Sequence, residues 1–176
     1  MDRLVVTSLD KLPNVDNKLS KFVKDPSSLW SVLRDTGGAI SGEFARMFLF
    51  GRESPNELDI VVSDPQLIEG EKQKLFEEYL GDSEGYTLFV NEGTLSPRTT
   101  QVLRCTRNDG IVINVHCHIP GEADDVRHAV LDAAYSTHIA CVIGFGEAYC
   151  VFPPALREKD IWVLSLSLTT AQRSKL

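Results

Sequence analysis

The spacing of apolar positions along the chain predicts several helices. Apolar residues recur at helical spacing over residues 26–34, from 43 to 51, and after residues 64–65. The first of these helices begins at a proline, which a first turn accepts, and ends at Gly37, which permits a left-handed stop. A further helix is expected over residues 123–134, led by acidic residues that suit a helix N-terminus. The third helix is expected to turn four apolar residues toward the core: Leu75, Phe76, Tyr79 and Leu80.

Short runs of apolar and β-branched residues predict the strands. They cover residues 39–41, 58–62, 86–90, 101–107, 111–118 and 148–152. Asn-Asp-Gly at residues 108–110 predicts a hairpin between the fourth and fifth runs. Residues 135–143 fit either a helix or a strand, and residues 1–15 read as a loop. This order of elements predicts an α+β fold, a mixed β-sheet with helices packed mainly on one face.

The composition is that of a folded globular protein. The chain has 176 residues, 43% hydrophobic and 24% charged, enough to bury a core without a metal or disulfide. We expect an N-terminal extension over residues 1–25, one domain over residues 26–168 and a flexible tail over residues 169–176. No apolar run approaches the roughly 20 residues of a membrane span, and the first residues do not suit a signal peptide. Four cysteines without a CxxC pair predict buried free thiols and an intracellular, cytoplasmic setting.

Two acidic residues, Glu57 and Asp59, lie two apart at the start of a predicted strand and therefore point to one face. Their repulsion costs stability unless a cation lies between them, and Mg²⁺ binds one or two carboxylates together with substrate phosphate. Upstream, a predicted strand ends at Gly42, where a helix begins at once. Glycine there lets the backbone approach a ligand, and a helix N-terminus favours phosphate. A solvated strand edge and a simple turn glycine are the alternative interpretations.

The order of this loop, helix and acidic strand resembles the signature of the nucleotidyltransferase (DNA polymerase β-like) superfamily. The resemblance rests on residues 40–46, Ile-Ser-Gly-Glu-Phe-Ala-Arg, and residues 56–62, Asn-Glu-Leu-Asp-Ile-Val-Val, and covers roughly residues 30 to 155. Residues 135–143 and 148–153 add a narrower resemblance to uncharacterised fungal proteins of this fold. The resemblance implies that Glu57 and Asp59 are catalytic residues that bind Mg²⁺ or Mn²⁺. It also implies a nucleotide-binding loop and helix start formed by Ser41, Gly42, Glu43 and Arg46.

Two residues depart from the superfamily's pattern. Glu43 stands where Ser or Gly is usual, and its carboxylate would repel a triphosphate unless it points away or binds metal. Asn114 stands where catalytic members carry a third acid; it can offer an oxygen to a metal but cannot act as a base. His116 shares the strand face of Asn114, and the resemblance implies that this face looks toward Glu57 and Asp59. We prefer ordinary polar strand positions for His116 and His118 over a metal site, because no third ligand is close in sequence.

The charge distribution argues against a polynucleotide ligand. The net charge is −7, and Arg98, Arg104 and Arg107 along the hairpin suit a solvated face better than a phosphate clamp. We therefore expect a nucleoside triphosphate as partner, together with a small-molecule or protein acceptor, and no membrane. Two functions stay open: metal-dependent transfer of a nucleoside monophosphate to a hydroxyl, or a catalytically degenerate binding or regulatory protein, including a homo-oligomeric scaffold. Fold alone does not decide between them.

Overall fold

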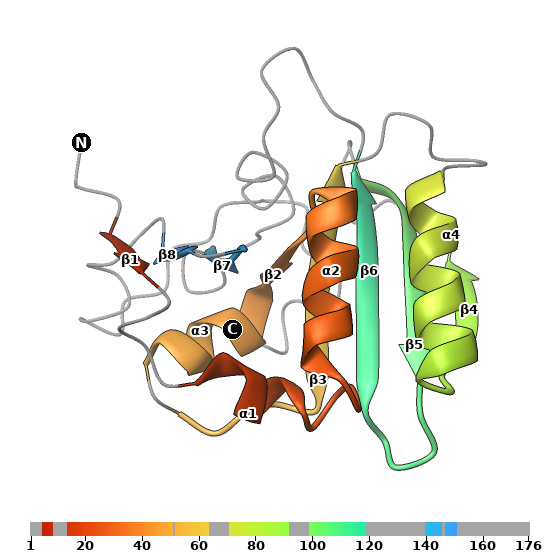
Figure 1. Cartoon of the computed structure of the whole chain (residues 1–176), viewed down its shortest axis with the longest axis horizontal. Helices are drawn as coiled ribbons and strands as arrows, with labels where there is room; N and C mark the ends of the chain where they lie inside the picture. The colour runs from red at the N-terminus through yellow and green to blue at the C-terminus, as the bar shows by residue number, and fades with distance from the viewer. Residues whose placement is uncertain are drawn as a thin grey trace, which may run out of the picture.

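The described part of the chain forms an eight-stranded mixed sheet with helices on one face. The computed structural model describes residues 5–8, 14–50, 52–63, 71–91, 99–118, 140–145 and 147–150. The strand order is β1-β8-β7-β2-β3-β6-β5-β4, and β3 and β6 run parallel while the other neighbours are antiparallel. The strands are β1 Val5–Ser8, β2 Ala39–Ser41, β3 Glu57–Ser63, β4 Thr87–Asn91, β5 Thr99–Thr106, β6 Val112–His118, β7 Cys141–Ile143 and β8 Glu147–Cys150. Figure 1 shows β1 and β4 at the two edges of the sheet.

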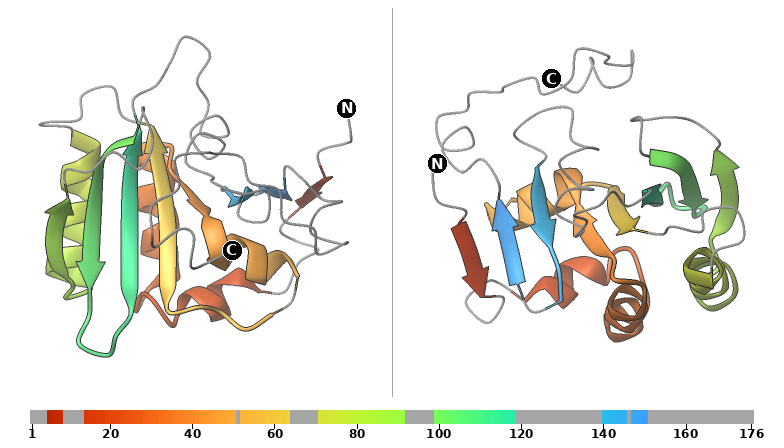
Figure 2. Two further views of the ribbon diagram at one scale, coloured as in Figure 1. Left: turned by 180° about the vertical axis from the view of Figure 1, so that it is seen from behind. Right: turned by 90° about the horizontal axis from the view of Figure 1, so that it is seen from above.

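Three helical elements cover one face of this sheet (Figure 2). They are α1 (Val15–Leu19), α2 (Pro26–Thr36) and α4 (Glu71–Glu77), which continues into the π-helical segment η2 (Glu78–Ser83). The fourth helix, α3 (Gly42–Leu49), follows β2 directly and packs against β3 and β7. The predicted α+β class, a mixed sheet with helices mainly on one face, is therefore confirmed.

The main core lies between the sheet and these helices, and it fixes which way β3 faces. Leu58, Ile60 and Val62 alternate along β3 and are buried in one cluster with residues of α2 and α4. Because strand residues alternate between faces, Glu57 and Asp59 point to the opposite face. The same alternation holds on the neighbouring strand β6, where Ile113 and Val115 join the core cluster.

The sequence predicted most of these elements correctly. Helix α2 has Pro26 in its first turn and Asp25 as its N-cap, and it ends at Gly37 with φ +66°. Strands β5 and β6 form the predicted hairpin, with Gly110 at φ +82° in the turn. The four cysteines are free and buried, as predicted. No helix in the described ranges has the length and apolarity needed to cross a membrane.

Two expectations were wrong. Residues 1–15 are not all loop, because Val5–Ser8 forms β1 through antiparallel pairing with the distant strand β8, and α1 begins at Val15. Residues that follow, among them Phe22 at 0% exposure, belong to the same core cluster as β3. Leu75 is 40% exposed rather than buried, since it lies at the margin of the apolar stripe of α4.

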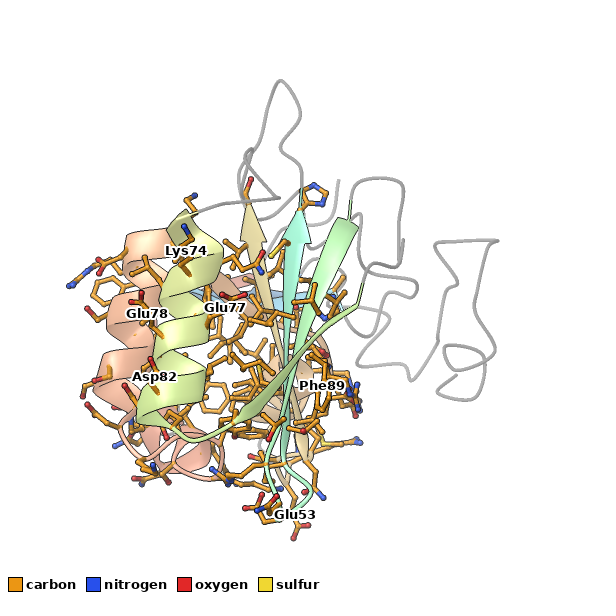
Figure 3. All side chains as sticks on the ribbon, turned by 90° about the vertical axis from the view of Figure 1, so that its right-hand side faces the viewer. Glu53, Lys74, Glu77, Glu78, Asp82 and Phe89 are labelled. Carbon is orange, nitrogen blue, oxygen red and sulfur yellow. The ribbon has the colours of Figure 1, made fainter. Side chains whose placement is uncertain are left out.

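The outer side of α4 and η2 is polar. Lys74, Glu78 and Asp82 recur at one-turn spacing on this side (Figure 3). The predicted helix over residues 123–134, residues 135–139, Arg98 and the tail after residue 168 lie outside the described residues.

Candidate functional site

The structure brings Glu57, Asp59 and Asn114 together on the sheet face away from the helices. Strands β3 and β6 are parallel neighbours, and Asp59 stands directly opposite Asn114. The Nδ2 atom of Asn114 donates to Glu57 Oε1 at 2.8 Å and to Asp59 Oδ1 at 2.9 Å. Asn114 is 5% exposed, so these two contacts are made in a largely buried position. The acidic pair thus shares a single amide donor.

Arg104 and His116 contact this cluster, although the sequence favoured a solvated face for Arg104 and an ordinary polar strand position for His116. Arg104 on β5 stands opposite Asn114, and its Nη1 donates to Asn114 Oδ1 at 3.3 Å and lies 3.8 Å from Glu57 Oε1. Phe89, opposite Arg104 on β4, lies on the same face of the sheet (Figure 3). His116 Nε2 is 3.2 Å from Asp59 Oδ1. The Asn-Asp-Gly turn could have given the β5–β6 register and hence the placement of Arg104.

The start of α3 is built against Asp59. Ser41 pairs with Asp59 across β2 and β3, so the next residue, Gly42, begins the helix directly beside the carboxylate. Gly42 has φ +69°, and a Cβ atom placed on it would lie 2.6 Å from Asp59 Oδ2. Ser41 occupies the N-cap position, but its side chain does not cap the helix. This geometry places a helix N-terminus, which favours anions, at the edge of the acidic pair.

Glu43 is paired within its own helix. Both guanidinium contacts go to one carboxylate: Arg46 Nε donates to Glu43 Oε2 at 2.8 Å, and Arg46 Nη2 bonds Glu43 Oε1. This hydrogen bonding raises the pKa of the Arg46 guanidinium above its ordinary value, although burial acts in the opposite direction. The negative charge that Glu43 adds at the helix start is therefore offset by a positive charge one turn later.

The acidic pair fits a divalent cation in ligand type but not fully in arrangement. Glu57 and Asp59 supply two carboxylates on one face, which suits Mg²⁺ or Mn²⁺ when substrate phosphate completes the coordination. Asn114, however, directs its nitrogen and not its oxygen at both carboxylates. Within the described ranges, no group of three or more His, Cys, Asp or Glu side chains could hold a metal ion.

Comparisons with known proteins address the fold. No protein-family model matches the chain, and no curated protein matches it. Among solved structures it is similar to a CCA-adding enzyme with ATP, at 18% identity over 94% of this chain and 38% of that chain, with a TM-score of 0.55. The CCA-adding enzyme of Thermotoga maritima complexed with tRNA matches at 18% identity over 94% of this chain and 37% of that one, with a TM-score of 0.57.

A third solved structure agrees with these two. It is a tRNA nucleotidyltransferase with a primer tRNA and an incoming ATP analogue, which matches at 17% identity over 78% of this chain and 39% of that chain, with a TM-score of 0.52. The chain spans less than two fifths of each of these three structures. Identities this low show the fold alone. The described chain therefore has a nucleotidyltransferase-type fold, and its acidic pair lies on the face of the sheet opposite to α1, α2 and α4.

Proposed function

We propose that this protein binds a nucleoside triphosphate where β2, α3 and β3 meet, and transfers its nucleoside monophosphate to a hydroxyl of a small molecule or protein, with release of pyrophosphate. The observation that carries the proposal is the contact between Gly42 and Asp59, which joins a helix N-terminus to the acidic pair. A site for phosphate and a site for a cation are thus direct neighbours. The similar solved structures with ATP and with CTP support a nucleoside triphosphate as ligand.

Each residue has a distinct part in this proposal. The triphosphate lies against the backbone of residues 41–43, and Arg46 offsets the charge of Glu43 beside it. Glu57 and Asp59 would hold Mg²⁺ or Mn²⁺, which when bound neutralises phosphate charge during an in-line displacement. His116 contacts Asp59 and helps to fix its orientation. The narrower resemblance to uncharacterised fungal proteins stays a prediction.

A second function is favoured by one observation. Asn114 stands where the superfamily's pattern has a third acid, and it offers the acidic pair a donor nitrogen. Fewer carboxylates give less negative charge with which to bind a cation and activate a hydroxyl. The alternative is therefore a catalytically degenerate member that binds a nucleotide for a regulatory purpose.

Thermal-shift titrations test the binding step that both functions share. Saturation with ATP, GTP, CTP or UTP, with and without Mg²⁺ or Mn²⁺, should raise the melting temperature for at least one nucleotide, since a ligand at 100 times its Kd stabilises by about 2.7 kcal/mol. Asp59→Asn should abolish that shift. Asp35→Asn is the matched control, because Asp35 is an exposed acid on α2. Absence of any shift under every metal condition would overturn the proposal.

Transfer of label then separates the two functions. The protein is incubated with α-phosphate-labelled nucleotide, metal and a panel of hydroxyl-bearing small molecules and proteins. Labelled product that Asp59→Asn fails to form supports the transferase. Binding without label transfer to any acceptor supports the degenerate binding protein.

A further inference from the structure

Arg104 determines which end of the Asn114 amide faces the acidic pair. An asparagine side chain carries an acceptor oxygen and a donor nitrogen, whereas a guanidinium carries only donors. Because Arg104 Nη1 donates to Asn114 Oδ1 at 3.3 Å, the amide nitrogen must point the other way, toward Glu57 and Asp59. Turning the amide over would bring two donors together at Arg104. It would also remove a hydrogen bond from each carboxylate.

The amide nitrogen occupies one position at which a cation could bridge the acidic pair. A cation bound to Glu57 Oε1 and Asp59 Oδ1 would compete with Asn114 Nδ2, which contacts these two oxygens at 2.8 and 2.9 Å. Arg104 adds a positive charge 3.8 Å from Glu57 Oε1, and this charge repels a second cation. Both effects stabilise the two carboxylates beside each other without a metal ion, and both oppose its binding.

We propose that Asn114 and Arg104 form an internal counter-charge for Glu57 and Asp59 that keeps the free protein's affinity for a divalent cation low. This inference rests on the assignment of Glu57 and Asp59 as metal ligands in the proposed function. It has a consequence for the order of binding. Asn114 does not offer its oxygen to a cation at this position, and phosphate oxygens of the nucleotide supply the missing ligands. The cation therefore binds together with the nucleotide and not before it.

The Kd for Mn²⁺ binding to the 176-residue chain, measured without nucleotide, tests the inference. Isothermal titration calorimetry or the electron paramagnetic resonance signal of free Mn²⁺ gives the Kd. Arg104→Met keeps the aliphatic stem and removes the like charge, and Asn114→Asp replaces the donor by a third carboxylate. Both variants should bind Mn²⁺ at least about tenfold more tightly than the unaltered protein. Arg34→Met is the matched control, since Arg34 is an exposed arginine on α2, and it should leave the Kd unchanged.

The melting temperature provides a second test that does not require a measured Kd for Mn²⁺. In chelator, Asn114→Asp should lower the melting temperature, because a third carboxylate then replaces the amide donor between Glu57 and Asp59, and Mn²⁺ should restore it. Nucleotide should tighten Mn²⁺ binding to the unaltered protein much more than to Asn114→Asp.

The outcomes separate this inference from the proposed function. Equal, measurable Mn²⁺ affinities for all variants would overturn the inference and leave the metal ligands of the proposed function in place. Failure of every variant to bind Mn²⁺, Asn114→Asp included, would overturn both. If Arg104→Met does not fold, Asn114→Asp alone decides by the same comparison.

Discussion

Replacing Gly42 by alanine tests whether the start of α3 and the acidic strand are built against each other. Gly42 has φ +69°, a left-handed conformation that an alanine adopts only with strain. Its added Cβ would also lie 2.6 Å from Asp59 Oδ2, closer than Cβ atoms come to other atoms. Asp59 cannot simply move aside, because Asn114 Nδ2 and His116 Nε2 both contact its Oδ1. Either the start of the helix or the carboxylate network must shift.

The loss of stability in Gly42→Ala has two contributions, the backbone strain at residue 42 and the displacement of Asp59, which can be estimated separately. The left-handed conformation alone costs roughly 1–2 kcal/mol for an alanine. Displacing Asp59 loses a hydrogen bond to a charged group, which adds about 1.5–3 kcal/mol. Gly37→Ala is the matched control, because Gly37 has φ +66° and an added Cβ there meets nothing within 4 Å. We expect Gly42→Ala to destabilise by about 2.5–5 kcal/mol, the sum of both terms, and Gly37→Ala by about 1–2 kcal/mol, from the first term alone.

Urea unfolding of the single and double variants measures this difference. A gap of about 1.5–3 kcal/mol corresponds to several degrees in melting temperature for a chain of this size, at roughly 2–4 °C per kcal/mol. An Asp59→Ala background removes the carboxylate oxygen at 2.6 Å and leaves the Cβ of residue 59 at 3.4 Å, an ordinary contact distance from the added methyl. There Gly42→Ala should cost no more than Gly37→Ala. Equal costs in the unaltered protein, or a cost that persists in the Asp59→Ala background, would refute the reasoning.

Three other predictions concern the ionisation of Tyr86, the hydrogen bond of Arg107 to Phe22, and the pairing of Arg46 with Glu43. Burial raises the pKa of Tyr86 to about 12 from its ordinary 10.0, so its contribution to stability is complete below pH 10 and is lost as the pH rises toward 12. Absorbance titration should show this late ionisation, and Tyr86→Phe should remove it. Arg107→Met removes the 2.9 Å bond to the carbonyl oxygen of Phe22 and should cost about 1.5–3 kcal/mol in urea unfolding. Arg46→Met should weaken the nucleotide-induced thermal shift by unpairing Glu43, whereas Glu43→Gln should not; equal losses would contradict that reading.

Local sequence patterns sufficed for the part of the fold that carries the acidic pair. The run of apolar and β-branched residues 58–62 predicted the strand, and the structure buries Leu58, Ile60 and Val62. That Glu57 and Asp59 share one face was predicted from their spacing of two residues. These features depend on neighbours a few residues away, which is why the sequence alone could predict them.

Long-range pairing decided the elements that the sequence missed. Strand β1 forms because Val5 pairs with Cys150 on the distant strand β8, and the pattern of residues 1–15 alone cannot indicate that partner. The burial of Phe22 likewise depends on Phe44, whose ring it meets edge-to-face at 5.4 Å. A segment with a loop-like sequence therefore joins the core through residues far along the chain.

The two departures from the superfamily's pattern are easier to understand together than one at a time. Glu43 adds a negative charge near the proposed phosphate site, and Arg46 offsets it from the same helix. Asn114 is neutral where the superfamily's pattern has an acid at the proposed metal site, and Arg104 adds a positive charge beside it.

Among the described residues, the carboxylates of Glu43, Glu57 and Asp59 and the guanidiniums of Arg46 and Arg104 sum to one negative charge, where three acids without such partners would sum to three. A less negative site attracts a bare cation less and repels a triphosphate less. The two departures thus act in one direction: they favour a ligand that brings phosphate and cation together over a cation that binds alone.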